Sequence, residues 1–104
     1  MQALTFKVTT VRLPEETIEA LEDLTNKLQR ERSEVMREAI QIGIGEMKLR
    51  LALELYKKGR VSFGRMAELT GLSQRELYLE LKRRNIPYRY GEERFSEEAH
   101  QLVG

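Results

Sequence analysis

The spacing of apolar and polar side chains changes abruptly near the start of the chain. Over residues 7–13 small, polar and β-branched side chains alternate as in a short β-strand, with Val8, Thr10 and Arg12 on one face. Pro14 then suits the first turn of a helix, and two glutamates follow it. A strand this short needs a pairing partner, and no similar segment lies nearby. The pattern predicts pairing with the same strand of a second copy.

Two helices are predicted after the strand, because apolar residues recur at intervals of three and four. The first spans about residues 14–30, and Ser33 is a good N-cap for the second. Gly43 and Gly45 interrupt the second helix, and they either let another helix approach closely or mark the end of a module. Its apolar surface is too wide for one small partner. A unit of this size is near the lower limit for folding alone, which predicts an obligate dimer.

The next part of the chain is predicted to be helical. Leucines alternate over residues 47–58 as in a strand, but the length and composition of this segment favour a helix. Residues 62–85 then indicate a helix, a turn and a second helix. Ser62 and Ser73 are placed to cap the two helices, and Gly71 suits a left-handed turn between them.

The expected fold is mainly α with one short N-terminal β-strand. It has two modules, a dimerisation module over residues 1–47 and a helical module with a short tail over residues 48–104. Past the last predicted helix, residues 88–90 are expected to form an extended wing or to cover the core. Ser96 is expected to cap a final short helix that contains His100, which we interpret as a solvated histidine.

Composition narrows the class of protein. The apolar fraction of 40% is enough for a core, and the charged fraction of 34% covers a surface without indicating disorder. No apolar run approaches the roughly 18 residues of a membrane span, and the N-terminus does not resemble a signal peptide. We therefore expect a cytoplasmic protein that does not contact membranes. The acidic residues are nearly all Glu, and Lys, Arg and Leu are abundant, which resembles thermophile and archaeal composition.

The net charge of +1 is unevenly distributed. Residues 1–46 hold six basic and nine acidic residues, a net charge of −3. Residues 47–104 hold 12 basic and eight acidic residues, a net charge of +4. Global charge therefore supports nucleic-acid binding only for the second half, with Lys7 and Arg12 as a local basic footprint in the first.

The segment of residues 6–47 resembles the ribbon-helix-helix fold of the MetJ and Arc type of repressors. The strand, the sequence Arg-Leu-Pro-Glu-Glu, the helix, the short turn and the apolar helix carry this resemblance. It implies that two strands pair antiparallel and lie in the major groove of double-stranded DNA. The base-contacting residues would then be Val8 on a thymine methyl, Thr10 on either base type and Arg12 on guanine. The expected phosphate-contacting residues are Lys7, Arg32, Ser33 and Glu34.

This segment departs from that family at two positions. Val8 is outward where a polar residue is common, and Thr9 is inward where an aliphatic one is common. Either a bulge shifts the register, or base reading is weaker than in a strict repressor. In the alternative interpretation, Thr10 and Arg12 only keep a dimerisation ribbon soluble.

The second half carries two further resemblances. Ala67, Gly71 four residues on and Leu77 six beyond that are similar to the helix-turn-helix pattern, although Glu80 stands where the pattern usually has an apolar residue. The wider segment of residues 50–93 resembles an uncharacterised family widespread in archaea and some bacteria. Its members look like antitoxins of PIN-domain ribonuclease toxins.

These resemblances leave three interpretations of the second half. On a DNA-binding interpretation, Gln74, Arg75 and Tyr78 start the recognition helix. The cations then available to phosphates are Arg60, Arg65, Lys82, Arg83 and Arg84. On an antitoxin interpretation the same helices form a protein-binding platform, and on the third they only extend the dimer.

Two functions therefore compete. The first is a homodimeric transcriptional regulator that binds a palindromic operator through the paired ribbon. An extension of this hypothesis is that the dimers form higher oligomers on DNA. The alternative is an antitoxin that neutralises a PIN-domain ribonuclease through its C-terminal half and also represses its own operon. An enzyme is not expected, because the sequence has no cysteine, no metal-ligand cluster, no phosphate-binding glycine loop and no nucleophile beside a base. No cofactor or metal site is expected for the same reasons.

Overall fold

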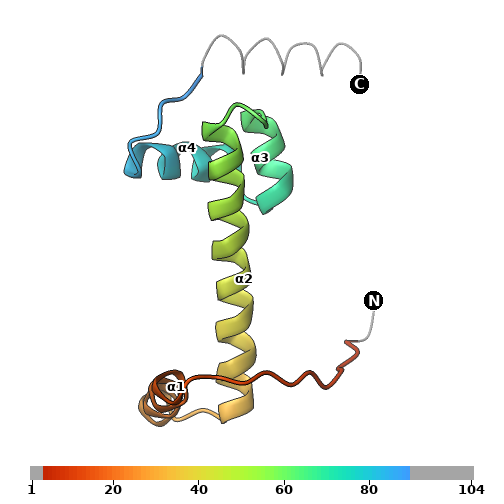
Figure 1. The fold of residues 1–104 in the computed structure, drawn as a ribbon, viewed down its shortest axis with the longest axis vertical. Helices are drawn as coiled ribbons and strands as arrows, with labels where there is room; N and C mark the ends of the chain where they lie inside the picture. Colours follow the sequence, from red (N-terminus) through yellow and green to blue (C-terminus); the bar gives the residue numbers. More distant parts are fainter. Residues whose placement is uncertain (1–3, 90–104) are drawn as a thin grey trace. The chain divides into compact units, whose positions relative to one another are not determined.

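A computed structural model describes residues 4–89, which contain four α-helices (Figure 1). The helices are α1 (Glu15–Leu28), α2 (Arg32–Lys57), α3 (Phe63–Thr70) and α4 (Gln74–Arg83). The chain divides into two compact units, Met1–Ile40 and Gln41–Gly104. This boundary lies inside α2, as does the boundary expected after residue 47. The predicted final helix with Ser96 and His100 lies outside the described residues.

The predicted N-terminal β-strand is wrong, and with it the ribbon-helix-helix fold class. Residues 4–14 lie outside any helix, and no strand occurs anywhere in residues 4–89. Alternating side chains suit a segment to a β-sheet, but they do not form a strand by themselves. A strand also needs backbone partners along an edge. The residues that the structure describes supply no such partner, and the Val8 side chain is 96% exposed. Val8, Thr10 and Arg12 therefore lie on an exposed segment and not on a paired ribbon.

Helix α1 begins and ends close to where its sequence predicts. Pro14 is its N-cap residue, with Glu15 and Glu16 in the first turn beside the positive end of the helix dipole. At the other end Gln29 adopts a left-handed conformation with φ of 52°, and its amide donates to the carbonyl of Asn26. This αL residue stops the helix and satisfies one of its last carbonyls.

The expected N-cap role of Ser33 is wrong, because α2 already begins at Arg32. The Val35 amide donates to the Glu31 carbonyl, so the helical turn starts before the serine. Arg30 lies just ahead of the helix and pairs with Glu34 at 3.0 Å and with Glu38 on the next turn. These ion pairs place Ser33 inside the first turn of α2.

The first unit has almost no core. Within its described residues, Val35 is the single buried apolar side chain. Apolar side chains of α1 and α2 that remain exposed include Leu24, Leu28 and Ile40. A unit of this size with so little buried apolar area does not fold by itself.

Helix α2 runs without interruption through Gly43 and Gly45, so these glycines do not end a helix. A Cβ atom added at either position would meet nothing within 4 Å. A glycine inside a helix is about 0.5–1 kcal/mol less stable than alanine. Nothing in the described chain therefore requires a glycine at either position.

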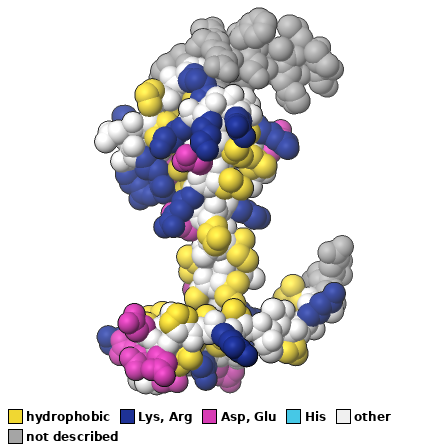
Figure 2. Space-filling model, in the orientation of Figure 1, with side chains coloured by type: hydrophobic (Ala, Val, Ile, Leu, Met, Phe, Trp, Pro, Cys, Tyr) yellow, Lys and Arg dark blue, Asp and Glu magenta, His cyan; other side chains and the backbone are white. Residues whose placement is uncertain are grey.

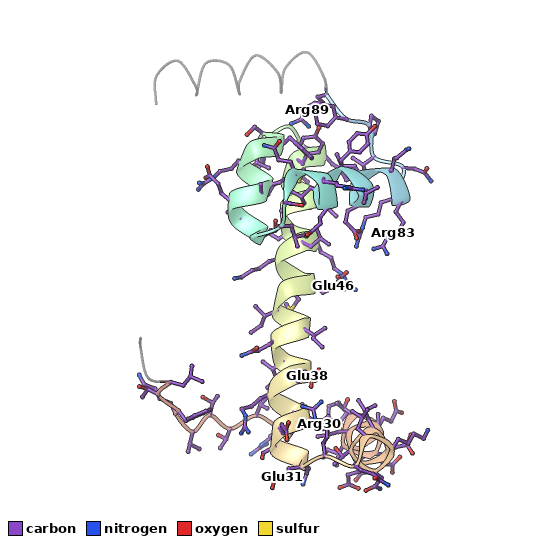
Figure 3. The ribbon with its side chains drawn as sticks, turned by 180° about the vertical axis from the view of Figure 1, so that it is seen from behind. Arg30, Glu31, Glu38, Glu46, Arg83 and Arg89 are labelled. Atoms are coloured by element: carbon purple, nitrogen blue, oxygen red, sulfur yellow. The ribbon has the colours of Figure 1, made fainter. Side chains whose placement is uncertain are left out.

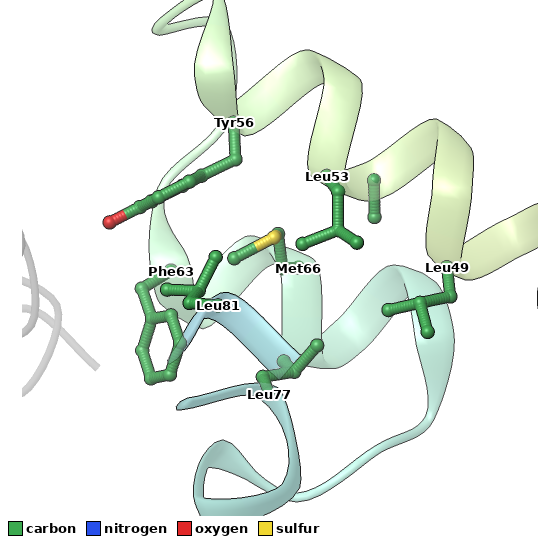
Figure 4. Close-up of a cluster of buried hydrophobic side chains, with 8 residues drawn as sticks. Leu49, Leu53, Tyr56, Phe63, Met66, Leu77 and Leu81 are labelled. Atoms are coloured by element: carbon green, nitrogen blue, oxygen red, sulfur yellow. The ribbon is translucent and has the colours of Figure 1, made fainter. Parts of the chain in front are cut away.

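The core of the second unit joins one face of α2 to α3 and α4 (Figure 4). The buried side chains are Leu49, Ala52, Leu53, Tyr56, Phe63, Met66, Leu77 and Leu81. The prediction of a helix over residues 47–58 is confirmed, because α2 continues to Lys57. The alternating leucines lie on opposite sides of this helix. Leu49 and Leu53 are buried, whereas Leu51 is exposed. Each fully buried leucine stabilises such a core by about 1.5–3 kcal/mol.

The segment after α4 covers this core. The Tyr88 ring lies edge-on to the Phe63 ring, with 4.9 Å between centroids. The Arg89 guanidinium stacks on the Tyr56 ring at 3.8 Å from its centroid and donates to the backbone carbonyls of Tyr56 and Val61. Of the two expectations for this segment, covering the core is the one that fits Tyr88 and Arg89, and residue 90 lies outside the described residues.

An ion-pair cluster also links α2 to α4 (Figure 3). Arg84 lies 3.4 Å from Glu46 of α2 and 3.1 Å from Glu80 of α4. Arg50 also contacts Glu46, at 3.1 Å. The hydrogen bond from Arg50 lowers the pKa of Glu46, and a second one from Arg84 adds to the effect, although partial desolvation opposes both.

The glycines of α2 and of the later turn should respond oppositely to alanine. We expect Gly45→Ala to raise the free energy of unfolding by about 0.5–1 kcal/mol, because its methyl group meets open space in a regular helix. Gly71→Ala should lower it by about 1–2 kcal/mol, because residue 71 has a φ of 74°. Urea denaturation followed by circular dichroism measures both. A loss of stability on Gly45→Ala would contradict the open environment.

The Glu46 cluster predicts a pH dependence. Because the folded-state pKa of Glu46 is lowered, its ionised form contributes stability above the ordinary glutamate pKa of about 4.3. This contribution is lost as the pH falls through the lower folded-state pKa. We therefore expect Glu46→Gln to be less stable than the parent at neutral pH, and the difference to shrink below about pH 4.3. Glu31→Gln is the control, since Glu31 makes no ion pair within residues 4–89. Urea titrations across this pH range would contradict the prediction if the Glu46→Gln difference stayed constant.

Candidate nucleic-acid interface

Helices α3 and α4 form a helix-turn-helix arrangement. The eight-residue α3 is followed by a three-residue turn and the ten-residue α4. Gly71 is left-handed with φ of 74°, and its amide donates to the Ala67 carbonyl over 2.9 Å. The Ser73 hydroxyl accepts from the Glu76 amide over 3.1 Å and caps α4. Leu77 is fully buried, so the predicted pattern of Ala67, Gly71 and Leu77 is confirmed as local structure.

The departure at Glu80 has a structural explanation. Its carboxylate is half-buried and accepts hydrogen bonds from Arg83 over 2.7 Å and from Arg84 over 3.1 Å. Two guanidinium groups thus compensate a charge where related arrangements place an apolar side chain. The position keeps its packing role without becoming apolar.

One side of α4 carries the exposed residues with recognition chemistry. Arg75, Tyr78 and Lys82 share this side, because helical residues three and four apart are neighbours. Arg75 and Lys82 are exposed and form no ion pair within the part of the chain that the structure describes. The Tyr78 ring is held edge-on to the Tyr88 ring, with 6.0 Å between centroids. Gln74, the first residue of α4, is exposed at its N-terminal end.

Further exposed cations lie on the same unit as α4. Arg60, Arg65 and Arg83 are exposed, with Arg65 paired to Glu68 at 2.6 Å and Arg83 to Glu80 at 2.7 Å. Residues 41–89 contain 11 basic and five acidic residues, a net charge of +6. Figure 2 shows Lys and Arg side chains gathered over this unit, whereas acidic side chains gather over α1. Surface pairs of this kind are weak and exchange readily with another anion.

Arg84 differs from the other predicted phosphate contacts. It is half-buried, and its hydrogen bond to Glu80, followed by that to Glu46, raises its pKa above the usual value for arginine. The structure thus places Arg84 in the ion-pair cluster between α2 and α4. Nothing in the sequence around residue 84 indicated this, because Glu46 lies 38 positions earlier in the chain.

The predicted phosphate contacts of the first unit are exposed but are not gathered by a ribbon. Arg32, Ser33 and Glu34 occupy the first turn of α2, and Lys7 lies on the extended segment. The Glu34 carboxylate contacts Arg30, and the hydrogen bonds that Arg30 donates to Glu38 and then to Glu34 raise the pKa of that arginine. Two carboxylates thus lie beside Arg30 at this turn, and the phosphate contacts of the first unit stay a prediction.

The sequence interpretation overlooked Leu79. Its side chain is 55% exposed on α4 beside Tyr78. The helical period that places Arg75 and Lys82 together also brings Leu79 to that side, so the signal was present in the spacing. An exposed leucine adds an apolar contact to an otherwise basic surface.

Residues 4–89 contain no group of three or more His, Cys, Asp or Glu side chains placed to hold a metal ion. Across the same residues, no helix combines the length and the apolar character that crossing a bilayer requires.

Comparisons with known proteins identify relatives of the chain. A UPF0175 protein of Archaeoglobus fulgidus is 53% identical over 45 residues, which cover 43% of this chain and 52% of that relative. The chain thus spans about half the length of this relative. Two UPF0175 proteins of Aeropyrum pernix are 44% identical over 54 residues and 37% identical over 65 residues. These matches cover 51% and 59% of this chain, and 68% and 73% of the relatives. No solved structure matches the chain.

A family model also matches residues 7–103, which is nearly the whole chain. Its description is an uncharacterised protein family, UPF0175. The expected resemblance of residues 50–93 to an uncharacterised family is thereby confirmed, and the match extends well beyond that segment. The chain belongs to the UPF0175 family.

Proposed function

We propose that this protein is a DNA-binding regulator that places α4 in the major groove. The observation that carries the proposal is the exposed side of α4, where Arg75, Tyr78 and Lys82 lie together on a helix-turn-helix arrangement. In proteins of this arrangement the second helix enters the groove and its first residues contact base edges. Here those residues are Gln74 and Arg75.

The buried side of α4 holds this helix in the rigid position that base recognition requires. Leu77 and Leu81 on its other side are 0% and 1% exposed, and they pack in the core with Met66 and Leu53. Reading a base requires side chains held within a narrow range of positions, which a rigid helix provides better than a loop. An α4 anchored by buried leucines meets this requirement.

The chemistry of the exposed residues matches the two kinds of DNA contact. An arginine donates two hydrogen bonds to guanine O6 and N7, and a glutamine can bond adenine N6 and N7. We assign these contacts to Arg75 and Gln74. The phosphate contacts fall to Arg60, Arg65, Lys82 and Arg83. Arg65 and Arg83 then exchange an exposed carboxylate for a phosphate, at little cost because exposed ion pairs are weak.

A second candidate function is neutralisation of a PIN-domain ribonuclease, as in the antitoxins that residues 50–93 resemble. The observation that favours it is the apolar exposure on the same unit, where Leu69 is 38% and Leu79 is 55% exposed. Protein interfaces need such apolar anchors, whereas DNA backbones do not. The two functions are compatible in one chain, since an antitoxin that binds DNA can repress its own operon.

Substitutions in α4 test the DNA proposal. The probes are duplexes selected from a random pool by the parent protein, compared with an unselected duplex at fixed salt. We expect Arg75→Ala to lose about 1–3 kcal/mol on selected duplexes and to relax preference at one base pair per half-site. Lys82→Ala should weaken both duplexes about equally and lower the salt slope by about 1. Arg12→Ala is the matched control, an exposed arginine of the first unit, and should keep the parent's preference.

Two outcomes would contradict the DNA proposal. An Arg75→Ala protein that discriminates among duplexes as well as the parent would contradict reading by α4. Failure of the parent to select any duplex would contradict DNA binding itself.

The antitoxin candidate has its own test. We expect Leu79→Asp to weaken a complex with a PIN-domain ribonuclease encoded beside the gene, because a buried carboxylate would replace an apolar anchor. The same change should leave the preference for selected duplexes intact. Nuclease inhibition and duplex binding are measured on the same preparations, and Arg75→Ala serves as the converse control. Full inhibition by Leu79→Asp would exclude Leu79 as the anchor.

A further inference from the structure

Helix α2 is apolar on two opposite sides within the second unit. One side carries the buried residues Leu49, Leu53 and Tyr56 of the core. The other carries an apolar stripe of three exposed residues, Ile44 at 48%, Met47 at 68% and Leu51 at 61% exposure. At 100° per residue, the stripe lies roughly opposite the core side. Neither α3 nor α4 covers it, because both pack on the core side.

We propose that the apolar stripe is the contact with a second copy of this chain. The intervals of three and four between Ile44, Met47 and Leu51 are those of a seam between two paired helices. A two-fold contact between identical helices brings the same three side chains of each copy together. Exposed apolar residues at this spacing are rare on a helix that faces water on one side.

The first unit buries little apolar surface by itself. Val35 is its single buried apolar side chain in the described residues, while Leu24, Leu28 and Ile40 remain exposed. Because α2 runs through both units, a copy of the chain that pairs along this helix would add buried apolar area to the first unit as well. A second copy is present whenever the chain is made, whereas a different protein or a ligand need not be. This added burial therefore favours a copy of the chain over an occasional partner.

The surroundings of the stripe suit a helix more than a nucleic acid. Glu54 and Lys58 stand at the positions where the next two apolar residues would fall, and they pair with each other at 3.8 Å. Lys48 lies beside the stripe together with Gly43, which is one turn before Met47. Charges of both signs at the border allow opposite charges to meet across two copies, and they offer a phosphate backbone little attraction.

Gly43 adds a second reason for a close helix contact. It weakens α2 relative to alanine, and a Cβ built there meets no atom within 4 Å apart from its own chain neighbours and the backbone of its own helix. Glycine beside an apolar seam lets the backbones of two helices approach closely. The second copy thus accounts for a residue that the single chain does not explain.

The test is the mass of the full chain in solution, measured without DNA. At micromolar concentrations, sedimentation equilibrium should give twice the chain mass of 12.2 kDa for the parent. Met47→Glu should shift the protein to the monomer mass, because two carboxylates would be forced together at the seam. Leu79→Glu is the matched control, since Leu79 is similarly exposed but lies on α4, and it should remain dimeric.

A crosslink covers the case in which Met47→Glu fails to fold. The chain has no cysteine, so Met47→Cys introduces a single thiol. We expect a disulfide-linked dimer under mild oxidation, and none for Glu76→Cys on the exposed side of α4. A monomeric parent would overturn the proposal. A dimer that withstands Met47→Glu and gives no crosslink at residue 47 would overturn it as well. Neither outcome depends on whether the protein binds DNA.

Discussion

The buried side chain of Tyr56 is the contact on which the second unit depends. It is 0% exposed at the end of α2, where its ring lies edge-on to Phe63 of α3 with 6.4 Å between centroids. The Arg89 guanidinium stacks on the same ring, and the tyrosine hydroxyl accepts from the Arg89 amide over 3.0 Å. One residue therefore joins α2, α3 and the segment that follows α4. These contacts help to fix the position of α4 and therefore of its exposed side.

The two units differ in the interactions that stabilise them. The second has a shared core, capped helices, an ion-pair cluster and an arginine that donates to the backbone carbonyls of Tyr56 and Val61. The first has two helices with one buried apolar side chain between residues 4 and 40. Small units without disulfides or metals need association to gain stability.

The second unit could be predicted from the sequence because its signals are local. Ser73 caps α4 and Gly71 turns the chain through interactions within four residues, so the pattern of polar and apolar positions is enough to find them. The N-terminal strand could not be judged in the same way. Alternation in residues 7–13 describes side chains, whereas a strand exists only if backbone groups elsewhere pair with it. The sequence of this segment does not show whether such a pairing partner exists.

Long-range contacts explain the remaining differences. Arg84 has the charge of a phosphate contact, but Glu46 holds it in the fold from 38 positions away. The separation of the leucines of α2 into a core side and an exposed side also follows from where α3 and α4 pack. The pattern predicted a helix but could not indicate which of its sides would stay uncovered. Leu79 is the exception, because helical spacing alone would have revealed it.

The contact between Arg89 and Tyr56 sets an order of events during synthesis. The carbonyl of Tyr56, in the last turn of α2, accepts a hydrogen bond from a side chain that is made 33 residues later. At roughly 5–20 residues per second, a ribosome needs several seconds to add that stretch. Until then the α2 end is exposed and its aromatic ring lacks the cation that covers it. A chain that ends before Arg89 therefore lacks the group that covers one face of the Tyr56 ring, so part of this core is open to water until Arg89 is added.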